Sequence, residues 1–133
     1  MTIEQLYRFG IAVLTHAGVE NAPFDASCLL ESSTGFSRTS QIVHRDMPIP
    51  QELEDLYRDM INRRISREPL QYILGQWEFM GHVFSVGKGV LIPRPETELT
   101  VEIVTQALQT FHKKTPVVLD LCAGSGCIGI SIA

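Results

Sequence analysis

The residues with the clearest chemical potential form one short stretch late in the 133-residue chain. Residues 117–121, Val-Val-Leu-Asp-Leu, predict a strand covered on both faces, and Asp120 places a carboxylate at its end. Gly124 and Gly126 allow backbone angles and close approaches that a Cβ would block, so they predict a tight turn. The isoleucine-rich residues 128–132 predict a helix whose free N–H groups point back at this turn. The stretch therefore predicts a site for a ligand with a polar or charged group.

Asp120 helps to choose between two classes of ligand. Residues 124–129, Gly-Ser-Gly-Cys-Ile-Gly, match a dinucleotide pattern that is weak by itself, and a carboxylate would repel a pyrophosphate. A ligand with an ammonium and a sulfonium would be attracted instead. The alternative role for Asp120 is a solvated strand end or a helix cap.

The stretch resembles the first motif of class I methyltransferases, which bind S-adenosylmethionine. Cys122 stands where that motif usually has its first glycine, and a small side chain fits there if its backbone is not left-handed. The resemblance implies that the cofactor-binding residues are Asp120, Cys122, Ala123, Gly124, Ser125 and Gly126.

Composition excludes several classes of protein. Charged residues make up 20% and hydrophobic residues 44%, which is typical of a globular protein. No apolar run approaches the roughly 20 residues that span a bilayer, and the N-terminus lacks the features of a signal peptide, so we expect a cytoplasmic protein without membrane contact. The net charge of −4 argues against binding to nucleic acid.

The cysteines and histidines predict neither disulfides nor a metal site, because none has ligand spacing. We expect Cys28 in the core and the histidines in structural or surface positions. The residues concerned are Cys28, Cys122, Cys127, His16, His44, His82 and His112.

Residues 1–75 predict a bundle of short helices. Apolar spacing predicts helices over residues 2–16, from Asp25 to about Gly35, and from Ser37 through Val43, capped by Thr2, Asp25 and Ser37. A fourth helix follows Pro50, and one more helical turn covers residues 69–75. The helix after Pro50 ends in Arg63, Arg64 and Arg67, which suits the helix dipole, although a docking patch is an alternative.

Residues 76–133 have a different character, so the whole chain is expected to be α+β. Residues 77–86 predict a β-hairpin, and two prolines then fix the backbone around Arg94. A helix starting at Pro95 or Thr97 follows. Its expected apolar face consists of Leu99, Ile103, Val104, Ala107, Leu108 and Phe111.

The order of these features resembles the HemK-type glutamine methyltransferases that modify peptide chain release factors. Residues 69–75, 77–79, 90–98 and 119–129 carry the resemblance. It implies an S-adenosylmethionine-dependent enzyme that methylates the side-chain amide nitrogen of the glutamine in a Gly-Gly-Gln loop. It also implies that residues 1–75 dock this substrate and that residues 76–133 begin a Rossmann-like methyltransferase domain.

Two further residues are expected in the cofactor pocket. Arg94 and Thr97 belong to the rigid loop just ahead of the motif, and such a loop can form one wall of the pocket.

The sequence departs from this family in one respect. The family orients the substrate amide with an Asn-Pro-Pro-Tyr motif, and this sequence has none, so we assign no catalytic residue. We therefore expect an N-terminal piece of an enzyme that is itself inactive. Residues after about Glu98 would be mobile, or would pair with another copy through the open strand edge.

Three alternatives stay open. A sister family methylates a glutamine of a ribosomal protein and has a Cys at the position of Cys122, but it usually lacks the Arg-Pro-acid-Thr-Glu run of residues 94–98. A nicotinamide-dependent oxidoreductase fragment would use the glycine pattern of residues 124–129. A stand-alone binding module would keep only the docking bundle.

Overall fold

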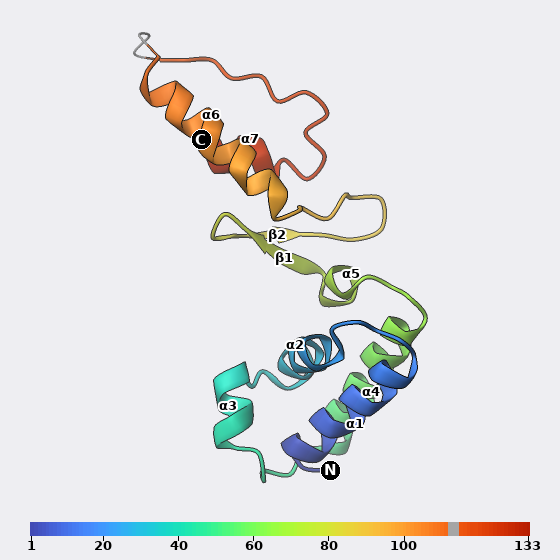
Figure 1. Cartoon of the computed structure of the whole chain (residues 1–133). Coiled ribbons are helices and arrows are strands. Elements are labelled where there is room, and N and C mark those ends of the chain that lie inside the picture. Colours follow the sequence, from blue (N-terminus) through green and yellow to red (C-terminus); the bar gives the residue numbers. More distant parts are fainter. Residues whose placement is uncertain (112–114) are drawn as a thin grey trace. The chain divides into compact units, whose positions relative to one another are not determined.

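The computed structural model describes residues 1–111 and 115–133, and His112 lies outside the described residues. The chain divides into two compact units, Met1–Leu74 and Gly75–Ala133, each described here by itself (Figure 1). The first unit contains α1 (Ile3–His16), α2 (Ala22–Thr34), α3 (Arg38–Val43), α4 (Gln51–Ile65) and α5 (Leu70–Leu74). The second contains β1 (Gln76–Phe79), β2 (His82–Ser85), α6 (Glu96–Gln109) and α7 (Cys127–Ile132).

Both ends of α1 have their free main-chain groups satisfied. The Gln5 N–H donates to Thr2 Oγ1 at 3.3 Å, and the Thr2 N–H donates to Gln5 Oε1 at 2.9 Å, which completes a capping box. The predicted Thr2 cap is therefore confirmed. At the other end, the Arg67 guanidinium donates to the carbonyls of Ala17 and Gly18, at 2.8 and 3.3 Å.

The start of α2 differs from the prediction. Asn21 is the N-cap and Pro23 lies in the first turn, where its missing N–H costs nothing. Asp25 is therefore inside the helix and is not its cap. Its buried carboxylate instead accepts a hydrogen bond from Arg64 Nε at 2.7 Å. The predicted end of the helix is confirmed, because Gly35 closes it in the left-handed conformation with φ +76°.

The predicted Ser37 cap of α3 is confirmed, since Ser37 Oγ accepts the Ser40 N–H at 3.3 Å. The helix predicted after Pro50 is also confirmed as α4, with Pro50 at its N-cap, and α5 supplies the predicted extra turn.

The arginines at the end of α4 have partners within the first unit. Arg63 forms two hydrogen bonds with Glu68, at 2.9 and 2.8 Å, and Arg64 pairs with Asp25. Arg67 caps α1 as described above. These contacts favour the structural interpretation of the cluster over a docking patch.

The centre of the first unit is a close contact between α1 and α4. The Tyr57 ring is fully buried, and its hydroxyl donates to the Ala26 carbonyl at 3.4 Å. This burial raises the pKa of Tyr57 well above its ordinary value. An added Cβ at Gly10 would lie 1.9 Å from the Tyr57 hydroxyl oxygen, so only glycine allows α1 to approach α4 this closely.

The predicted hairpin is confirmed as the antiparallel pair β1–β2, with Phe79 opposite His82. Met80 and Gly81 form its two-residue turn at φ +51° and +75°, as the right-handed twist of paired strands favours. The Met80 N–H donates to Glu98 Oε1 at 2.9 Å, which ties the turn to the first turn of α6.

The second unit has a small core. A cluster of buried residues from the hairpin, α6 and α7 forms it, namely Phe79, Phe84, Val101 and Cys127. On α6 the prediction was wrong: Val101 is its buried residue, whereas Leu99, Ile103 and Phe111 are exposed. The predicted face would cover a sheet, and the hairpin is too narrow to receive it.

Residues 117–121 also differ from the prediction, because they form no strand and are largely exposed, with Val117 at 98%. A strand needs neighbours for its N–H and C=O groups, and in the described residues β1 and β2 pair only with each other. The described residues are thus α+β, rich in helix with one hairpin, and the Rossmann-like start expected for residues 76–133 stays a prediction. No helix in the described ranges is both long and apolar enough to cross a membrane.

Replacing Gly10 with alanine tests the contact between α1 and α4. Helix propensity alone would stabilise the protein by about 1 kcal/mol. Overpacking against a fixed ring costs about 1 to 3 kcal/mol, and the very short Cβ–oxygen distance points to the upper end. We therefore expect Gly10→Ala to lower the free energy of unfolding, measured by urea denaturation. Ala12→Gly, at an exposed position of the same helix, calibrates propensity. A more stable Gly10→Ala protein would contradict the packing described here.

Candidate functional site

The glycine turn precedes α7 and has the backbone that the sequence predicts. Gly124 and Gly126 have φ of +58° and +75°, in the left-handed region that favours glycine. The Gly126 N–H donates to the Ala123 carbonyl at 2.8 Å and closes the turn. Gly126 is the N-cap of α7, so the free N–H groups of this helix face the turn. The tight turn and the helix after it are confirmed, while the ligand role of the turn stays a prediction.

Asp120 lies against the first turn of α7. Its Oδ2 accepts the Gly129 N–H at 3.1 Å, so the carboxylate binds one of the free donors at the positive end of the helix. This is the helix-cap role that the sequence left open. Oδ1 has no hydrogen-bond partner among the described residues. Asp120 can therefore hold the helix with one oxygen and accept a hydrogen bond from a ligand with the other.

A side chain at the position of Cys122 is expected to fit if its backbone is not left-handed, and the structure does not meet this condition. The φ of Cys122 is +61°, so a side chain occupies a left-handed position that usually takes glycine. Such a backbone costs a non-glycine residue about 1 to 3 kcal/mol. The thiol is exposed, and the strain is therefore a property of the turn and not of a packed interior.

Arg94 and Thr97 form no hydrogen bond or ion pair with the described residues of the glycine turn. The Thr97 N–H donates to the Arg94 carbonyl at 3.0 Å, which opens α6. Arg94 is exposed and Thr97 half-buried, and in the described ranges neither forms a hydrogen bond or ion pair with residues 120–126. The structure thus brings together Asp120, the glycine turn and the start of α7, and their place in a common pocket with Arg94 and Thr97 stays a prediction.

One contact of this unit was missed by sequence reasoning. The Glu98 carboxylate accepts the Met80 N–H. Nothing in the local pattern indicated this contact, because the two residues are 18 positions apart. For Asp120 the sequence offered the cap role but did not identify Gly129 as its partner.

A cavity of about 370 Å³ adjoins Asp120 on the side of α7. Its walls are mostly apolar, and Asp120 is the charged residue among them. The lining residues are Leu108, Pro116, Val118, Asp120, Gly129, Ile132 and Ala133. Residues 122–126 do not line this cavity. The Asp120 carboxylate therefore borders a cavity that the glycine turn does not line.

The cysteines do not form a metal site with other residues of the described part of the chain, where no group of three ligand-type side chains gathers. Cys28 is half-buried, and burial raises the pKa of its thiol, with the carboxylates of Asp25 and Glu31 adding to the effect. The thiol is therefore held in its protonated, less reactive form.

The structure thus defines a protein with a helical unit and a second unit that carries a glycine turn with a carboxylate behind it. Residues 5–75 match the family model described as the PrmC N-terminal domain, and the chain belongs to this family.

Bacterial relatives resemble nearly the whole chain. Proteins from Clostridium botulinum and Geobacter sulfurreducens are 38% and 40% identical to it over 132 residues, which is 99% of this chain. A protein from Bifidobacterium longum is 39% identical over 137 aligned residues. Each is named a release factor glutamine methyltransferase. The chain spans 46%, 45% and 46% of these relatives, so it is similar to less than half of each.

The bond between Asp120 and α7 can be tested directly. Asp120→Ala removes the acceptor of the Gly129 N–H. A hydrogen bond to a charged group is worth about 1.5 kcal/mol, so we expect amide exchange at Gly129 to become about tenfold faster, measured by NMR. Glu102→Ala, which removes an exposed carboxylate of α6, is the matched control and should leave this amide unchanged. Equal exchange in all three proteins would show that Asp120 does not cap α7.

Proposed function

We propose that this chain forms the N-terminal part of an S-adenosylmethionine-dependent methyltransferase whose substrate is a glutamine side chain of a peptide chain release factor. The observation that carries the proposal is the similarity of 99% of the chain to proteins named for this activity. Those names favour a release factor over a ribosomal protein. They also support a cytoplasmic location, because release factors act on the ribosome.

The chemistry of residues 120–126 fits this cofactor. S-adenosylmethionine carries an ammonium and a sulfonium and supplies an electrophilic methyl group when it is bound. The free oxygen of Asp120 offers a hydrogen-bond acceptor for the ammonium and a negative charge that attracts the sulfonium. The glycine turn lets a ligand approach the main chain of residues 122–126 without meeting side chains at Gly124 and Gly126. Arg94 and Thr97 are proposed as a further wall of the same pocket.

The cofactor supplies the methyl group, and the protein has to position the acceptor. An amide nitrogen is a poor nucleophile, so catalysis depends on orienting it for in-line attack. The resemblance assigns this task to an Asn-Pro-Pro-Tyr motif, which the sequence given does not contain. Within this chain, the proposed tasks are cofactor binding by residues 120–126 and docking of the release factor by the helical unit, Met1–Leu74.

A chimera tests the proposed function. Residues 1–133 would replace the matching segment of the Geobacter sulfurreducens relative, and methyl transfer to a purified release factor would be followed by mass spectrometry. We expect one methyl group on the glutamine of the Gly-Gly-Gln loop, and none when that glutamine is replaced by asparagine. Asp120→Ala in the chimera should raise the Kd for S-adenosylmethionine about tenfold, and Glu102→Ala should not. A folded chimera that methylates no release factor would refute the proposal.

The 133-residue chain alone should not methylate a release factor and should bind S-adenosylmethionine weakly or not at all. Residues 117–121 form no strand, so the glycine turn lacks the rigid support that tight binding needs. Calorimetric titration measures the affinity, and light scattering measures whether the exposed residues 117–121 pair two copies. Tight binding of the cofactor by a monomer would contradict this expectation.

A further inference from the structure

The short helix α3 presents its apolar residues to solvent. Ile42 and Val43 are 71% and 68% exposed, whereas the buried residue of α3 is the polar Gln41. A surface helix ordinarily has the opposite arrangement, with apolar residues toward the core.

Gln41 explains this orientation. Its Nε2 donates to the carbonyls of Ser27 and Phe36, at 3.0 and 2.9 Å, and its Oε1 accepts the Ser27 hydroxyl at 3.1 Å. Both amide hydrogens and the amide oxygen are thus satisfied in a buried position. Turning α3 to bury Ile42 would break this network and leave its members unpaired, so the apolar side is held outward.

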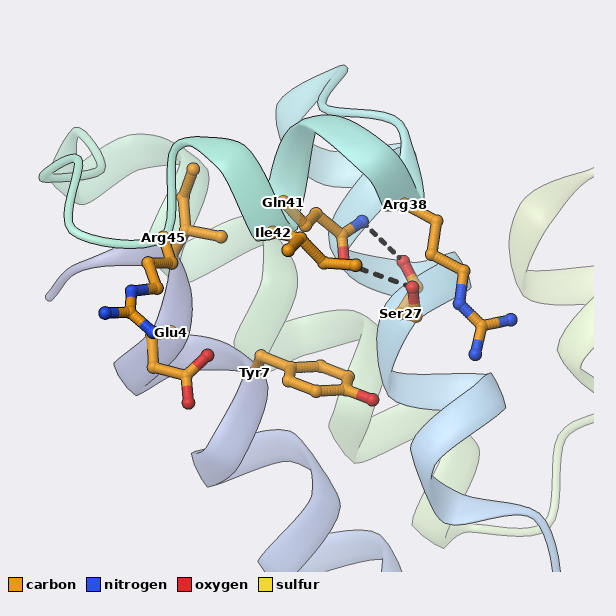
Figure 2. Close-up of a pocket in the computed structure, with 8 residues that line it drawn as sticks. Glu4, Tyr7, Ser27, Arg38, Gln41, Ile42 and Arg45 are labelled. Atoms are coloured by element: carbon orange, nitrogen blue, oxygen red, sulfur yellow. Dashed lines mark hydrogen bonds between the residues drawn. The ribbon is translucent and has the colours of Figure 1, made fainter.

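Ile42 borders a groove of about 260 Å³ between α1, α2 and α3. Figure 2 shows the Tyr7 ring at the base of this groove, with Glu4 and Arg45 on one side and Arg38 on the other. The volume is below the 300–1,000 Å³ that is typical of small-molecule sites. A single protein side chain is therefore a better occupant than a cofactor.

The rim of the groove is cationic. Arg38 forms no ion pair with a described carboxylate, and Arg45 reaches only its neighbour Asp46, at 3.5 Å, with both side chains well exposed. Exposed pairs of this kind contribute little, so both guanidinium groups remain available. The Glu4 carboxylate also borders the groove and pairs with Arg8, so the lining has two guanidinium groups and one carboxylate. Two available arginines thus flank an apolar residue. They stand out in residues 1–74, where seven arginines are outnumbered by ten acidic residues.

We propose that this groove docks an acidic segment of the release factor, with one apolar side chain against Ile42 and Tyr7 and carboxylates at Arg38 and Arg45. The proposal rests on the proposed function, because that function supplies the partner. The cationic rim favours an acidic segment by charge complementarity. The exposed apolar residues of α3 supply a surface that the bound segment would shield from water.

Binding of the 133-residue chain to a purified release factor, followed by fluorescence anisotropy, tests the groove. We expect Ile42→Asp, and separately the double change Arg38→Glu with Arg45→Glu, to weaken binding at least tenfold. Leu56→Asp, at an exposed apolar position of α4, and Lys88→Glu, at an exposed position of the other unit, are the matched controls and should change the Kd less than twofold. All the positions are exposed, so circular dichroism should show unchanged melting. Wild-type binding should weaken with salt, and binding by the double variant should weaken less.

Three outcomes would overturn the proposal: equal binding by all variants, no binding by the wild type, or a wild-type dimer that Ile42→Asp makes monomeric, which would assign the groove to a second copy. The methylation chimera separates this failure from failure of the proposed function. An active chimera with groove variants that bind normally refutes the groove alone. A chain that binds through the groove, combined with an inactive chimera, refutes the methyltransferase function and leaves the docking site.

Discussion

The need of a strand for hydrogen-bonding neighbours decides what the second unit can form. Residues 117–121 have the composition of a buried strand, yet an isolated strand would leave its N–H and C=O groups without partners. In the described residues the hairpin is paired only with itself, and residues 117–121 stay irregular. The exposed face of α6 has the same cause, because that face has no sheet to cover. The helix instead packs Val101 against Phe79 and Phe84 of the hairpin.

The helical unit does not depend on such pairing, because each helix satisfies most of its own main chain, and side chains cap the start of α1 and of α3. Thr2 and Gln5 cap the start of α1, and Arg67 reaches its end from beyond α4. The pair formed by Asp25 and Arg64 then joins α2 to α4 across 39 positions of sequence. With both partners present, the buried carboxylate of Asp25 is compensated; removing the guanidinium alone would leave it unpaired. Charged side chains therefore fix how the helices meet, in addition to the apolar core.

The sequence predicts those parts of the fold that depend on neighbouring residues. The Thr2 and Ser37 caps, the helix end at Gly35 and the hairpin follow from short patterns. Errors arise where a distant group decides. Asp25 has the type of a helix cap, but Pro23 lets the helix begin earlier and Arg64 provides a buried partner. Apolar spacing on α6 identifies a face without saying what covers it. On α3, the sequence predicts the helix but not which side faces inward, and the amide network of the distant Ser27 and Gln41 decides that side.

Within a few residues, the candidate site also combines features that neighbouring residues determine with one that needs distant partners. Asp120 binds α7 only nine positions further on, and the turn between them is closed by the Gly126 N–H, so both form without a sheet. This local order already sets the direction in which α7 points its free N–H groups. It also holds Cys122 in a left-handed conformation, a cost that the turn bears whether or not a ligand is present. What the local order does not supply is a rigid base, because the residues just before Asp120 are exposed and irregular. Neighbouring strands would hold the main chain of residues 117–121 in place, and affinity for a ligand at the turn would then rise without any change in the residues that contact it.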